Sequence, residues 1–216
     1  MKLRAYRKED AAIICSWISD VEALYRWSAD RIGKYPLHAA DLNANYEPFL
    51  TSERFIPLTA VNEVDRVIGH LFIRYPSESD TDTVRFGFVI VDPAIRGRGQ
   101  GKTMLKLAAV YAREILHASR ITLGVFLNNA SARYCYEAVG FRATGQVVKY
   151  QMPVGEWECI EMVLSLKGND ASGMPTDAKS TNTITGVRTD RVSITDESGM
   201  RTKICYFEGE ESEYNP

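Results

Sequence analysis

The sequence lacks any long apolar run. No stretch of eighteen apolar residues occurs among its 216 residues, although a membrane-spanning helix needs about 20. The first residues, Met1 to Arg4, lead directly into an expected strand and have none of the features of a secretory leader. The formal net charge is only −2, so a general affinity for nucleic acid or for an anionic membrane is not expected. These absences favour a cytoplasmic protein without a membrane partner.

Metal-binding and disulfide patterns are also missing. The four cysteines form no C-x-x-C pair, and the three histidines are scattered. Zinc sites need closely spaced Cys and His ligands, so we expect no metal. The cysteines are interpreted as reduced thiols with structural roles. The residues concerned are Cys15, Cys135, Cys159 and Cys205, and His38, His70 and His117.

A glycine-rich loop at 96–103 is the most informative feature that is present. It follows an apolar run at 86–91, which predicts a buried strand, and it precedes apolar residues at helical spacing. Alternating glycines leave backbone N–H groups uncrowded, while the helix dipole and three cationic side chains add positive potential. The loop therefore predicts a phosphate or pyrophosphate site. Its residues are Arg96, Gly97, Arg98, Gly99, Gln100, Gly101, Lys102 and Thr103.

Two familiar phosphate loops fail on spacing. A Walker A loop that used Gly101-Lys102-Thr103 needs glycine at position 96, and a dinucleotide-binding G-x-G-x-x-G needs glycine at 102. Arg96 and Lys102 stand there instead. A nucleotide-binding protein thus stays as a weaker alternative. The pattern that does fit is Arg/Gln-x-x-Gly-x-Gly/Ala, on Arg96, Gly99 and Gly101.

With the preceding Val91-Asp92-Pro93, this loop resembles the acyl-CoA pyrophosphate loop of the GNAT superfamily of N-acetyltransferases. The segment 129–141 resembles the superfamily's N-x-x-A-x-x-x-Y-x-x-x-G-F pattern through Asn129, Ala132, Tyr136 and Gly140-Phe141. The resemblance covers residues 1–167. Three further segments are similar to the ribosomal-protein N-terminal acetyltransferase branch: Trp17-Ile18-Ser19, Arg26-Trp27 and Gly155-Glu156-Trp157.

The hydrophobic pattern predicts an alternation of strands and helices. Strands are expected at 2–6, 54–61, 66–75, 83–91, 120–126, 141–150 and 157–166, and helices at 9–18, 21–27, 38–51, 99–117 and 130–138. This order implies an α/β (α+β) fold with a mixed sheet and helices on both faces. The resemblance implies the GNAT fold, a mostly antiparallel sheet in which two central parallel strands splay apart. The pantetheine arm is then expected in that gap.

Composition changes after residue 167. Residues 168–216 are rich in Asp, Ser, Thr and Gly and carry nine acidic against five basic side chains. Residues 168–183 have the composition of a linker. Apolar alternation at 191–195 and 200–207 favours a β-hairpin, which an acidic tail follows. We therefore expect an acetyltransferase domain at 1–167 and a small β extension beyond it. The sequence leaves open a homodimer in which two chains pair through this extension.

The resemblance also implies roles for single residues. Tyr136 is expected to be the catalytic proton donor to the departing thiolate, although packing against the core would also explain it. Asn129 is expected to contact the cofactor or to cap its helix. The cofactor-binding set is Phe88, Val89, Ile90, Val91, Arg96, Gly97, Arg98, Gly99, Gln100, Gly101, Lys102, Thr103, Asn129 and Ala132.

The acceptor is expected to bind beside the first two helices, where aromatic residues gather. Tyr25 and Trp27 are the candidate contacts, with core packing as the alternative. Many relatives carry a carboxylate base where this chain has Arg85, and arginine cannot accept a proton at physiological pH. Arg85 would instead hold a substrate carboxylate or form a salt bridge within the sheet. The base is then a water chain or another carboxylate, such as Asp80, Asp82 or Glu22.

These features predict an acetyl-CoA-dependent N-acetyltransferase. The amine of a small molecule or of a peptide N-terminus would attack the thioester directly. No covalent enzyme intermediate is expected, because Cys135 has no paired histidine. A catalytically silent acyl-CoA-binding regulatory module is the alternative, because Arg85 replaces the usual carboxylate.

Overall fold

The computed structural model describes residues 1–167 in full and the backbone of residues 187–195 and 201–209. The helices are α1 (Asp10–Ser16), α2 (Val21–Ser28), α3 (Ala39–Tyr46), α4 (Gln100–Glu114) and α5 (Ala130–Val139), with short 3-10 turns η1 (Glu47–Phe49) and η2 (Pro93–Ile95). The strands are β1 (Lys2–Ala5), β2 (Phe55–Val61), β3 (Val67–Arg74), β4 (Thr83–Val91), β5 (Arg120–Phe126), β6 (Arg142–Met152), β7 (Gly155–Ser165), β8 (Val187–Thr195) and β9 (Arg201–Gly209).

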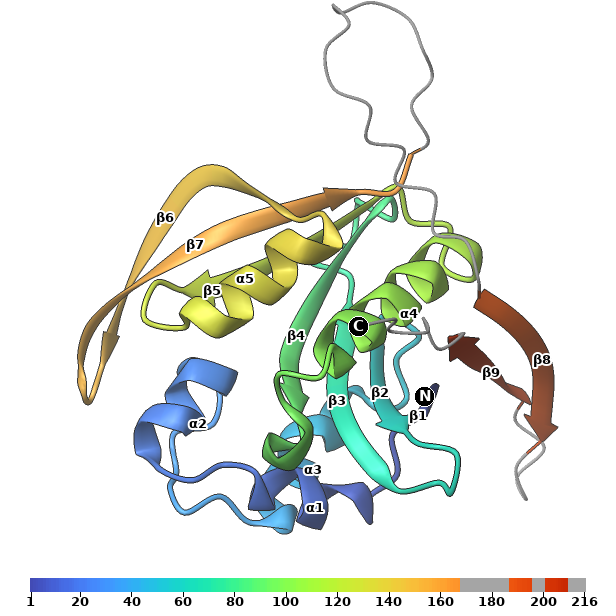
Figure 1. Cartoon of the computed structure of the whole chain (residues 1–216), viewed down its shortest axis with the longest axis horizontal. Coiled ribbons are helices and arrows are strands. Elements are labelled where there is room, and N and C mark those ends of the chain that lie inside the picture. Colours follow the sequence, from blue (N-terminus) through green and yellow to red (C-terminus); the bar gives the residue numbers. More distant parts are fainter. Residues whose placement is uncertain (168–186, 196–200, 210–216) are drawn as a thin grey trace, which may run out of the picture.

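The described strands form one mixed sheet in the order β6-β7-β5-β4-β3-β2-β1-β9-β8. All neighbouring pairs are antiparallel except β4 and β5, which run parallel. In Figure 1, α4 and α5 lie in front of the sheet, and α1, α2 and α3 lie at its lower end and behind it. The predicted α/β class, the mostly antiparallel sheet and its central parallel pair are confirmed.

Local sequence explains where the helices begin and end. The side chain of Asp20 accepts a hydrogen bond from the backbone N–H of Ala23 and so caps α2. Gly140, at φ +114°, ends α5 in the left-handed conformation that glycine adopts without strain. The helix predicted at 38–51 is shorter than expected, because Pro48 lacks the N–H that a further α-helical turn requires.

Two apolar layers, one on each face, hold the helices to the sheet. On one face, buried residues of α4 and α5 pack against β3, β4, β5 and β7 around Phe86 and Phe141. On the other face, buried residues of α1, α2 and α3 pack against β2, β3 and β4 around Tyr46, Phe72 and Phe88. Both layers contact β4, which therefore lies at the centre of the molecule with its side chains alternating between them.

The second layer also contains a buried polar network. Arg4 donates two hydrogen bonds to the Asp10 carboxylate, at 2.7 and 2.8 Å, and Thr59 donates a third. These hydrogen bonds outweigh the effect of burial and lower the pKa of Asp10. At pH values above 3.8, the usual pKa of an aspartate, the ionised Asp10 therefore stabilises the folded protein. This stabilisation is lost only as the pH falls below that value.

His70 lies in β3 and is fully buried, with its Nε2 2.7 Å from the hydroxyl oxygen of Tyr46. Burial lowers the pKa of His70 to about 3, although Asp10 acts in the opposite direction. Between about pH 6.5 and pH 3 the unfolded chain therefore binds a proton at this residue that the folded protein does not. The free energy of unfolding should fall as the pH falls through this window, by roughly 1 kcal/mol per pH unit.

We expect His70→Gln to remove this slope, because glutamine does not titrate. Urea denaturation at several pH values between 6.5 and 4.5 measures it. The control is His117→Gln, since His117 is exposed in the turn after α4 and its replacement should keep the wild-type slope. An unchanged slope in the His70 variant would contradict the assignment.

The C-terminal strands extend the sheet beyond β1. β8 and β9 are antiparallel, from Val187↔Gly209 to Thr195↔Arg201, as the hairpin prediction requires. β9 in turn pairs with β1 at Leu3↔Phe207. The predicted linker, turn and acidic tail lie outside the described residues.

Candidate functional site

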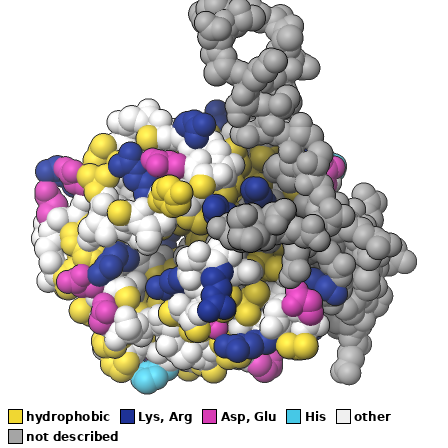
Figure 2. Space-filling view, viewed as in Figure 1, with side chains coloured by type: hydrophobic (Ala, Val, Ile, Leu, Met, Phe, Trp, Pro, Cys, Tyr) yellow, Lys and Arg dark blue, Asp and Glu magenta, His cyan; other side chains and the backbone are white. Residues whose placement is uncertain are grey.

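A cleft of about 520 Å³ lies between the two halves of the molecule. Figure 2 shows this face hollowed, with Lys and Arg side chains beside the hollow. The cleft is walled by β4 and β5, the segment that leads into α2, the loop before α4, and α5. Its lining residues are Trp17, Ile18, Ser19, Ala23, Arg26, Trp27, Phe86, Gly87, Phe88, Val89, Ile90, Val91, Arg96, Gly97, Gly99, Gln100, Gly101, Lys102, Leu105, Leu123, Gly124, Val125, Asn129, Ser131, Ala132, Tyr134, Cys135 and Tyr136.

The cleft opens because β4 and β5 separate. Their parallel pairing covers only Thr83–Arg85 against Arg120–Thr122. Beyond this point β4 continues to pair with β3, and β5 with β7. The facing edges of 86–91 and 123–126 therefore have no ladder partner across the gap, and backbone N–H and C=O groups there are available to a ligand. The splayed pair implied by the resemblance is present.

A bulge in β4 lies at the middle of the cleft. Phe88 has a positive φ of 51°, and the register with β3 shifts between His70 and Phe72. Two residues of β4 there oppose one residue of β3, which bends the strand and redirects its peptide groups. A positive φ in a phenylalanine is strained, and strain of this kind is often found at functional sites. Trp27 packs over Phe88 with the two ring centres 4.8 Å apart.

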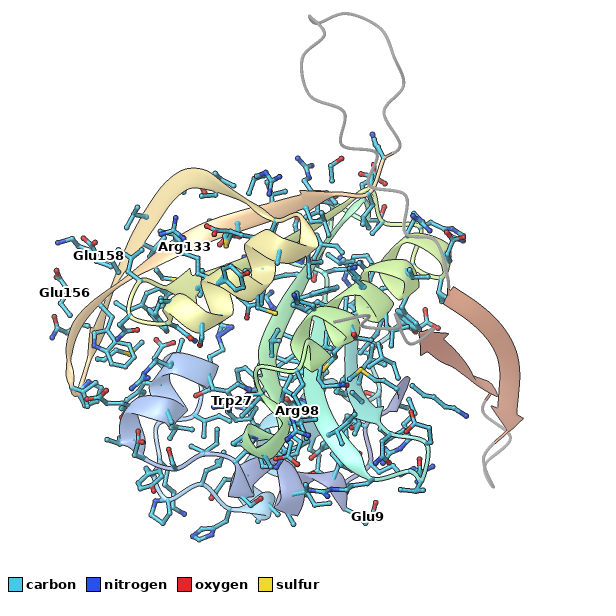
Figure 3. The ribbon with its side chains drawn as sticks, in the orientation of Figure 1. Glu9, Trp27, Arg98, Arg133, Glu156 and Glu158 are labelled. Carbon is cyan, nitrogen blue, oxygen red and sulfur yellow. The ribbon has the colours of Figure 1, made fainter. Side chains whose placement is uncertain are left out.

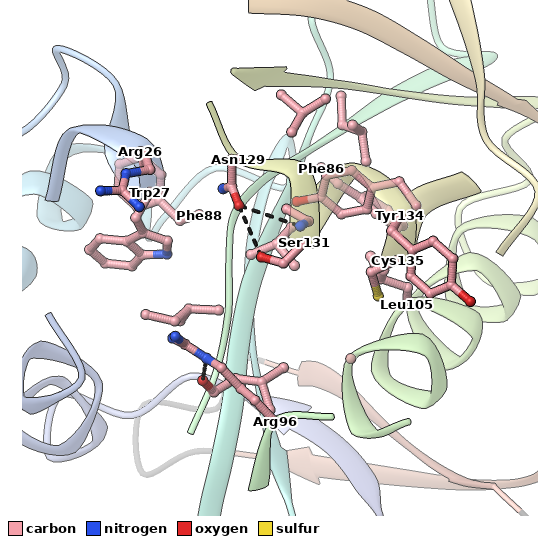
Figure 4. A pocket seen from close by; sticks show the side chains of 18 of the residues that line it. Arg26, Trp27, Phe86, Phe88, Arg96, Leu105, Asn129, Ser131, Tyr134 and Cys135 are labelled. Atoms are coloured by element: carbon pink, nitrogen blue, oxygen red, sulfur yellow. Dashed lines mark hydrogen bonds between the residues drawn. The ribbon is translucent and has the colours of Figure 1, made fainter. Parts of the chain in front are cut away.

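The glycine-rich loop forms the lower wall and has the geometry of an anion site. Gly97 and Gly99 both have φ of +77°, a conformation that other residues adopt only with strain. Gly99 is the N-cap of α4, and no side chain caps this helix. The first N–H groups of α4 are therefore free of a capping side chain and available to an external acceptor. Arg96 is held by a hydrogen bond from its Nε to the carbonyl of Val91, at 3.3 Å (Figure 4).

Two members of the predicted cofactor-binding set do not line the cleft. Arg98 lies in the loop before α4 (Figure 3) but is absent from the lining. Thr103 points its hydroxyl back to the carbonyl of Gly99, at 3.4 Å, within the first turn of α4. The other residues predicted to bind the cofactor are all brought together there.

Asn129 caps α5. Its side chain accepts hydrogen bonds from the N–H of Ala132, at 3.4 Å, and from the hydroxyl of Ser131, at 3.3 Å (Figure 4). The capping role that the sequence allowed is therefore present. Because Asn129 also lines the cleft, its amide group remains near a bound ligand.

Tyr136 lies at the inner wall, with only 7% of its surface exposed. Burial raises the pKa of its phenol, with smaller contributions from Cys135 and Cys159. The phenol therefore stays protonated at neutral pH. Tyr134, two residues earlier, is 70% exposed, so the motif spacing selected the buried tyrosine. Burial also raises the pKa of the Cys135 thiol, which makes it a poor nucleophile.

Of the two candidate acceptor contacts on α2, the structure places one in the cleft and the other in the core. Trp27 lines the cleft beside Arg26, with its indole nitrogen edge turned toward β4 (Figure 4). Tyr25 does not line it. Tyr25 is 5% exposed and packs with Phe126 and Met152, so the packing alternative describes it.

Arg85 also lies outside the lining. Its guanidinium forms a two-pronged ion pair with Glu161 of β7, one arm of which measures 3.0 Å, and contacts the hydroxyl of Thr122 at 3.4 Å. The salt bridge within the sheet, one of the two predicted roles, is therefore observed. This pair nevertheless borders the cleft, because the Arg85 Nη2 lies 3.0 Å from the position that a Cβ on Gly124 would occupy.

None of the three carboxylates considered as a base lines the cleft. Asp80 accepts hydrogen bonds from the backbone N–H groups of Asp82 and Thr83, in the turn before β4. Glu22 pairs with Arg26 at 2.8 Å on the surface of α2. Among residues 1–167, no Asp or Glu side chain is part of the lining.

The wall formed by β5 was not predicted from the sequence. Leu123, Gly124 and Val125 face the residues of β4 across the gap. The predicted separation of the strands was the signal that could have found them, because the second splayed strand must form the opposite wall.

Two further absences hold for the part of the chain that the structure describes. It contains no group of Cys, His, Asp and Glu side chains arranged to hold a metal ion. No helix there has the length and apolar character to span a bilayer.

Comparisons with known proteins agree with this geometry. The family model described as "Acetyltransferase (GNAT) family" matches residues 21–141. The mycothiol acetyltransferase of Jonesia denitrificans is 27% identical over 144 residues, which are 64% of this chain and 45% of that protein. The spermine/spermidine N(1)-acetyltransferase of Bacillus subtilis is 31% identical over 77 residues, 36% of this chain and 51% of that protein. The chain thus spans about half the length of the curated relatives that it matches.

The same fold occurs in the spermidine N-acetyltransferase of Vibrio cholerae in complex with CoA and spermine. That structure matches with a TM-score of 0.63 and 19% identity, over 76% of this chain and 94% of that chain. These relatives are polyamine and mycothiol acetyltransferases, so the predicted resemblance to the ribosomal-protein branch is not supported.

Proposed function

Because the chain belongs to the GNAT family of acetyltransferases, we propose that it transfers the acetyl group of acetyl-CoA to the primary amine of a small molecule. The observation that carries this proposal is a single continuous cleft. It joins the glycine-rich loop before α4, the separated strands β4 and β5, and the aromatic residues Trp17 and Trp27 beside and within α2.

The residues at the loop suit the diphosphate of CoA. Arg96 and Lys102 supply positive charge, and the start of α4, whose first N–H groups have no side-chain cap, lines the same space. Gly97 and Gly99 have open space where a Cβ would stand, so the backbone can approach a phosphate closely. The free edge of β4 at 86–91 would hold the pantetheine arm through backbone hydrogen bonds.

When bound, acetyl-CoA supplies an activated acyl group as a thioester. The protein's contribution is to hold that group beside the amine, which removes much of the entropy cost of a two-molecule reaction. An N–H of the bulged segment near Phe88 would donate a hydrogen bond to the carbonyl oxygen that gains charge during transfer. Burial raises the pKa of the Cys135 thiol and makes it a poor nucleophile, so no covalent bond to the protein would form.

Tyr136 would donate a hydrogen bond to the sulfur as the thiolate departs. Its raised pKa makes the phenol a weak acid, so it would stabilise the developing charge more than it would surrender its proton outright. Since the described lining contains no carboxylate, water in the open cleft would accept the proton of the attacking amine.

A peptide N-terminus is a second candidate for the acceptor, but both reported curated relatives carry the names of small-molecule acetyltransferases. We place the acetyltransferase domain at 1–167 and keep the extension at 168–216 separate from it. The free thiols Cys15, Cys135 and Cys159 support a reducing compartment, for which we propose the cytoplasm.

The test is a thiol-release assay with acetyl-CoA and a broad panel of amines and peptides, alongside the thermal stability of the protein with CoA or Mg-ATP. We expect turnover with at least one amine and stabilisation by CoA greater than by Mg-ATP. CoA binding without turnover on any amine would favour a silent acyl-CoA-binding module, which the carboxylate-free lining also motivates. Greater stabilisation by Mg-ATP would favour the nucleotide-binding alternative.

A further inference from the structure

The acceptor end of the cleft borders a group of arginines that has too few carboxylate partners. Arg74 in β3 and Arg85 in β4 are directly opposite each other in the antiparallel register. Side chains in such a pair lie on the same face, with their Cβ atoms about 5 Å apart. Two like charges at this spacing repel each other and destabilise the pair, so this arrangement needs a compensating anion.

The carboxylate that contacts this group is already engaged. Glu161 is held by both arms of the Arg85 guanidinium. Arg74 forms no ion pair and no side-chain hydrogen bond among the described residues. Burial lowers the pKa of Arg74, and the nearby charges of Arg31 and Arg85 lower it further against the opposing effect of Glu161. Among the described residues, Arg74 and Arg85 thus share the carboxylate of Glu161, which leaves a net positive charge in a half-buried place.

This group is continuous with the cleft. Arg85 lies two residues before Gly87 on the same strand, and its guanidinium lies against Gly124. Both glycines line the cleft where β4 and β5 begin to separate. An acceptor whose amine reaches the bulge at Phe88 can therefore extend toward Arg74 along this face of the sheet.

Donors without partners also face the acceptor from α2. The indole Nε1 of Trp27 and the Nε of Arg26 are buried without a hydrogen-bond partner among the described residues. Both residues line the cleft. A buried N–H that has no acceptor costs free energy, and a ligand that supplies oxygen atoms would recover it.

The same features disfavour a polycation. A polyamine carries several positive charges, which carboxylates would have to balance, and no Asp or Glu of residues 1–167 lines the cleft. Glu156 and Glu158 lie at the outer end of β7, away from it (Figure 3). Like charges placed together in a binding site weaken binding.

We propose that the acetyl acceptor is an amine that carries an oxyanion, either a carboxylate or a phosphate, which binds at Arg74 and Arg85. This inference rests on the proposed acetyltransferase function and specifies its substrate class. It separates this chain from the polyamine acetyltransferases to which it is similar.

The test compares matched acceptors in the acetyl-CoA assay. One set holds glycine, β-alanine, 4-aminobutyrate, 6-aminohexanoate and phosphoethanolamine; the second set holds uncharged alkylamines of the same lengths; the third holds spermidine and spermine. We expect kcat/KM for the best anionic acceptor to exceed that of its uncharged counterpart, and of both polyamines, by at least about tenfold. Comparing kcat/KM for phosphoethanolamine with kcat/KM for the amino acids shows whether the site prefers a phosphate or a carboxylate.

Arg74→Gln should remove this preference, mainly by raising KM for the anionic acceptor about tenfold or more. The fold should tolerate the change, because glutamine relieves the repulsion from Arg85 and breaks no ion pair of the described residues. Arg113→Gln is the control, since Arg113 lies on α4 and pairs with its neighbour Glu114 at the surface. It should leave kinetics unchanged.

Preferred acetylation of spermidine or of an uncharged amine would overturn this inference and leave the acetyltransferase function intact. Unchanged anion preference in the Arg74 variant would overturn it too. If no amine is acetylated although CoA binds, the proposed function fails, and calorimetry with the CoA complex then decides on the anion site. Binding of 4-aminobutyrate or phosphoethanolamine that weakens in Arg74→Gln supports the site, and absence of binding removes it.

Discussion

Replacing Gly99 with valine should weaken CoA binding by about 100-fold. Gly99 holds a φ of +77° at the N-cap of α4, where a side chain costs about 1–2 kcal/mol. Relaxing that strain would turn the first N–H groups of the helix away from the diphosphate. Each lost hydrogen bond to a charged group costs about 1.5–3 kcal/mol, and 1.4 kcal/mol corresponds to a factor of ten in affinity. Calorimetric titration with CoA measures the effect.

Gly145→Val is the matched control. Gly145 has a φ of +85° in β6, and, as at Gly99, nothing lies within 4 Å of the position of an added Cβ. It does not line the cleft. The two variants should therefore lose similar amounts of thermal stability, while only the Gly99 variant loses CoA affinity. Equal CoA affinity in both would show that the loop conformation does not matter for binding.

Tyr136→Phe should lower kcat by about 100-fold, the lower limit for loss of a positioned proton donor. CoA affinity should stay within about twofold, because the ring and its contact with Phe141 remain. Since burial raises the pKa of Tyr136, its ionisation should not produce an alkaline decline in the wild-type rate below pH 10. Steady-state kinetics with the best acceptor of the panel, together with CoA calorimetry, check both expectations.

Tyr134→Phe provides the comparison for this prediction. Tyr134 also lines the cleft, two residues away, but its side chain is 70% exposed, so loss of its hydroxyl should lower kcat far less than loss of the Tyr136 hydroxyl. If the two variants behave alike, or if Tyr136→Phe changes stability but not rate, Tyr136 is a core residue and not a proton donor.

The loop, the strand before it and the second motif could be predicted from the sequence because each depends on neighbours in the chain. The glycines at positions 97 and 99 predict a left-handed backbone conformation, and both residues adopt it. The order of strands and helices follows from short-range periodicity. Helix α3 is the exception, where Pro48 outweighs a pattern that otherwise continues.

The rotation of α2 about its axis determines which of its two aromatic candidates faces the cleft. Residues two apart on a helix point in directions about 200° apart, so Tyr25 and Trp27 cannot both face the cleft. Trp27 does, beside Arg26, and Tyr25 packs against Phe126. The sequence shows the spacing but not which side faces the sheet, because that depends on how α2 docks.

The surroundings of Arg85 could not be predicted either. Its partner Glu161 lies 76 residues away, and the two meet only because β5 pairs with both β4 and β7. The bulge at Phe88 likewise depends on the register between β3 and β4. Contacts across a sheet require the strand order, which a single sequence does not provide.

We propose that the start of α4 binds the diphosphate of CoA. Calorimetric titration of the folded protein with CoA and with pantetheine, which has the same arm and thiol without the diphosphate, tests it most directly. We predict one saturable site for CoA and binding of pantetheine at least about 100-fold weaker. Equal binding of the two compounds, or no heat with CoA, would contradict the account.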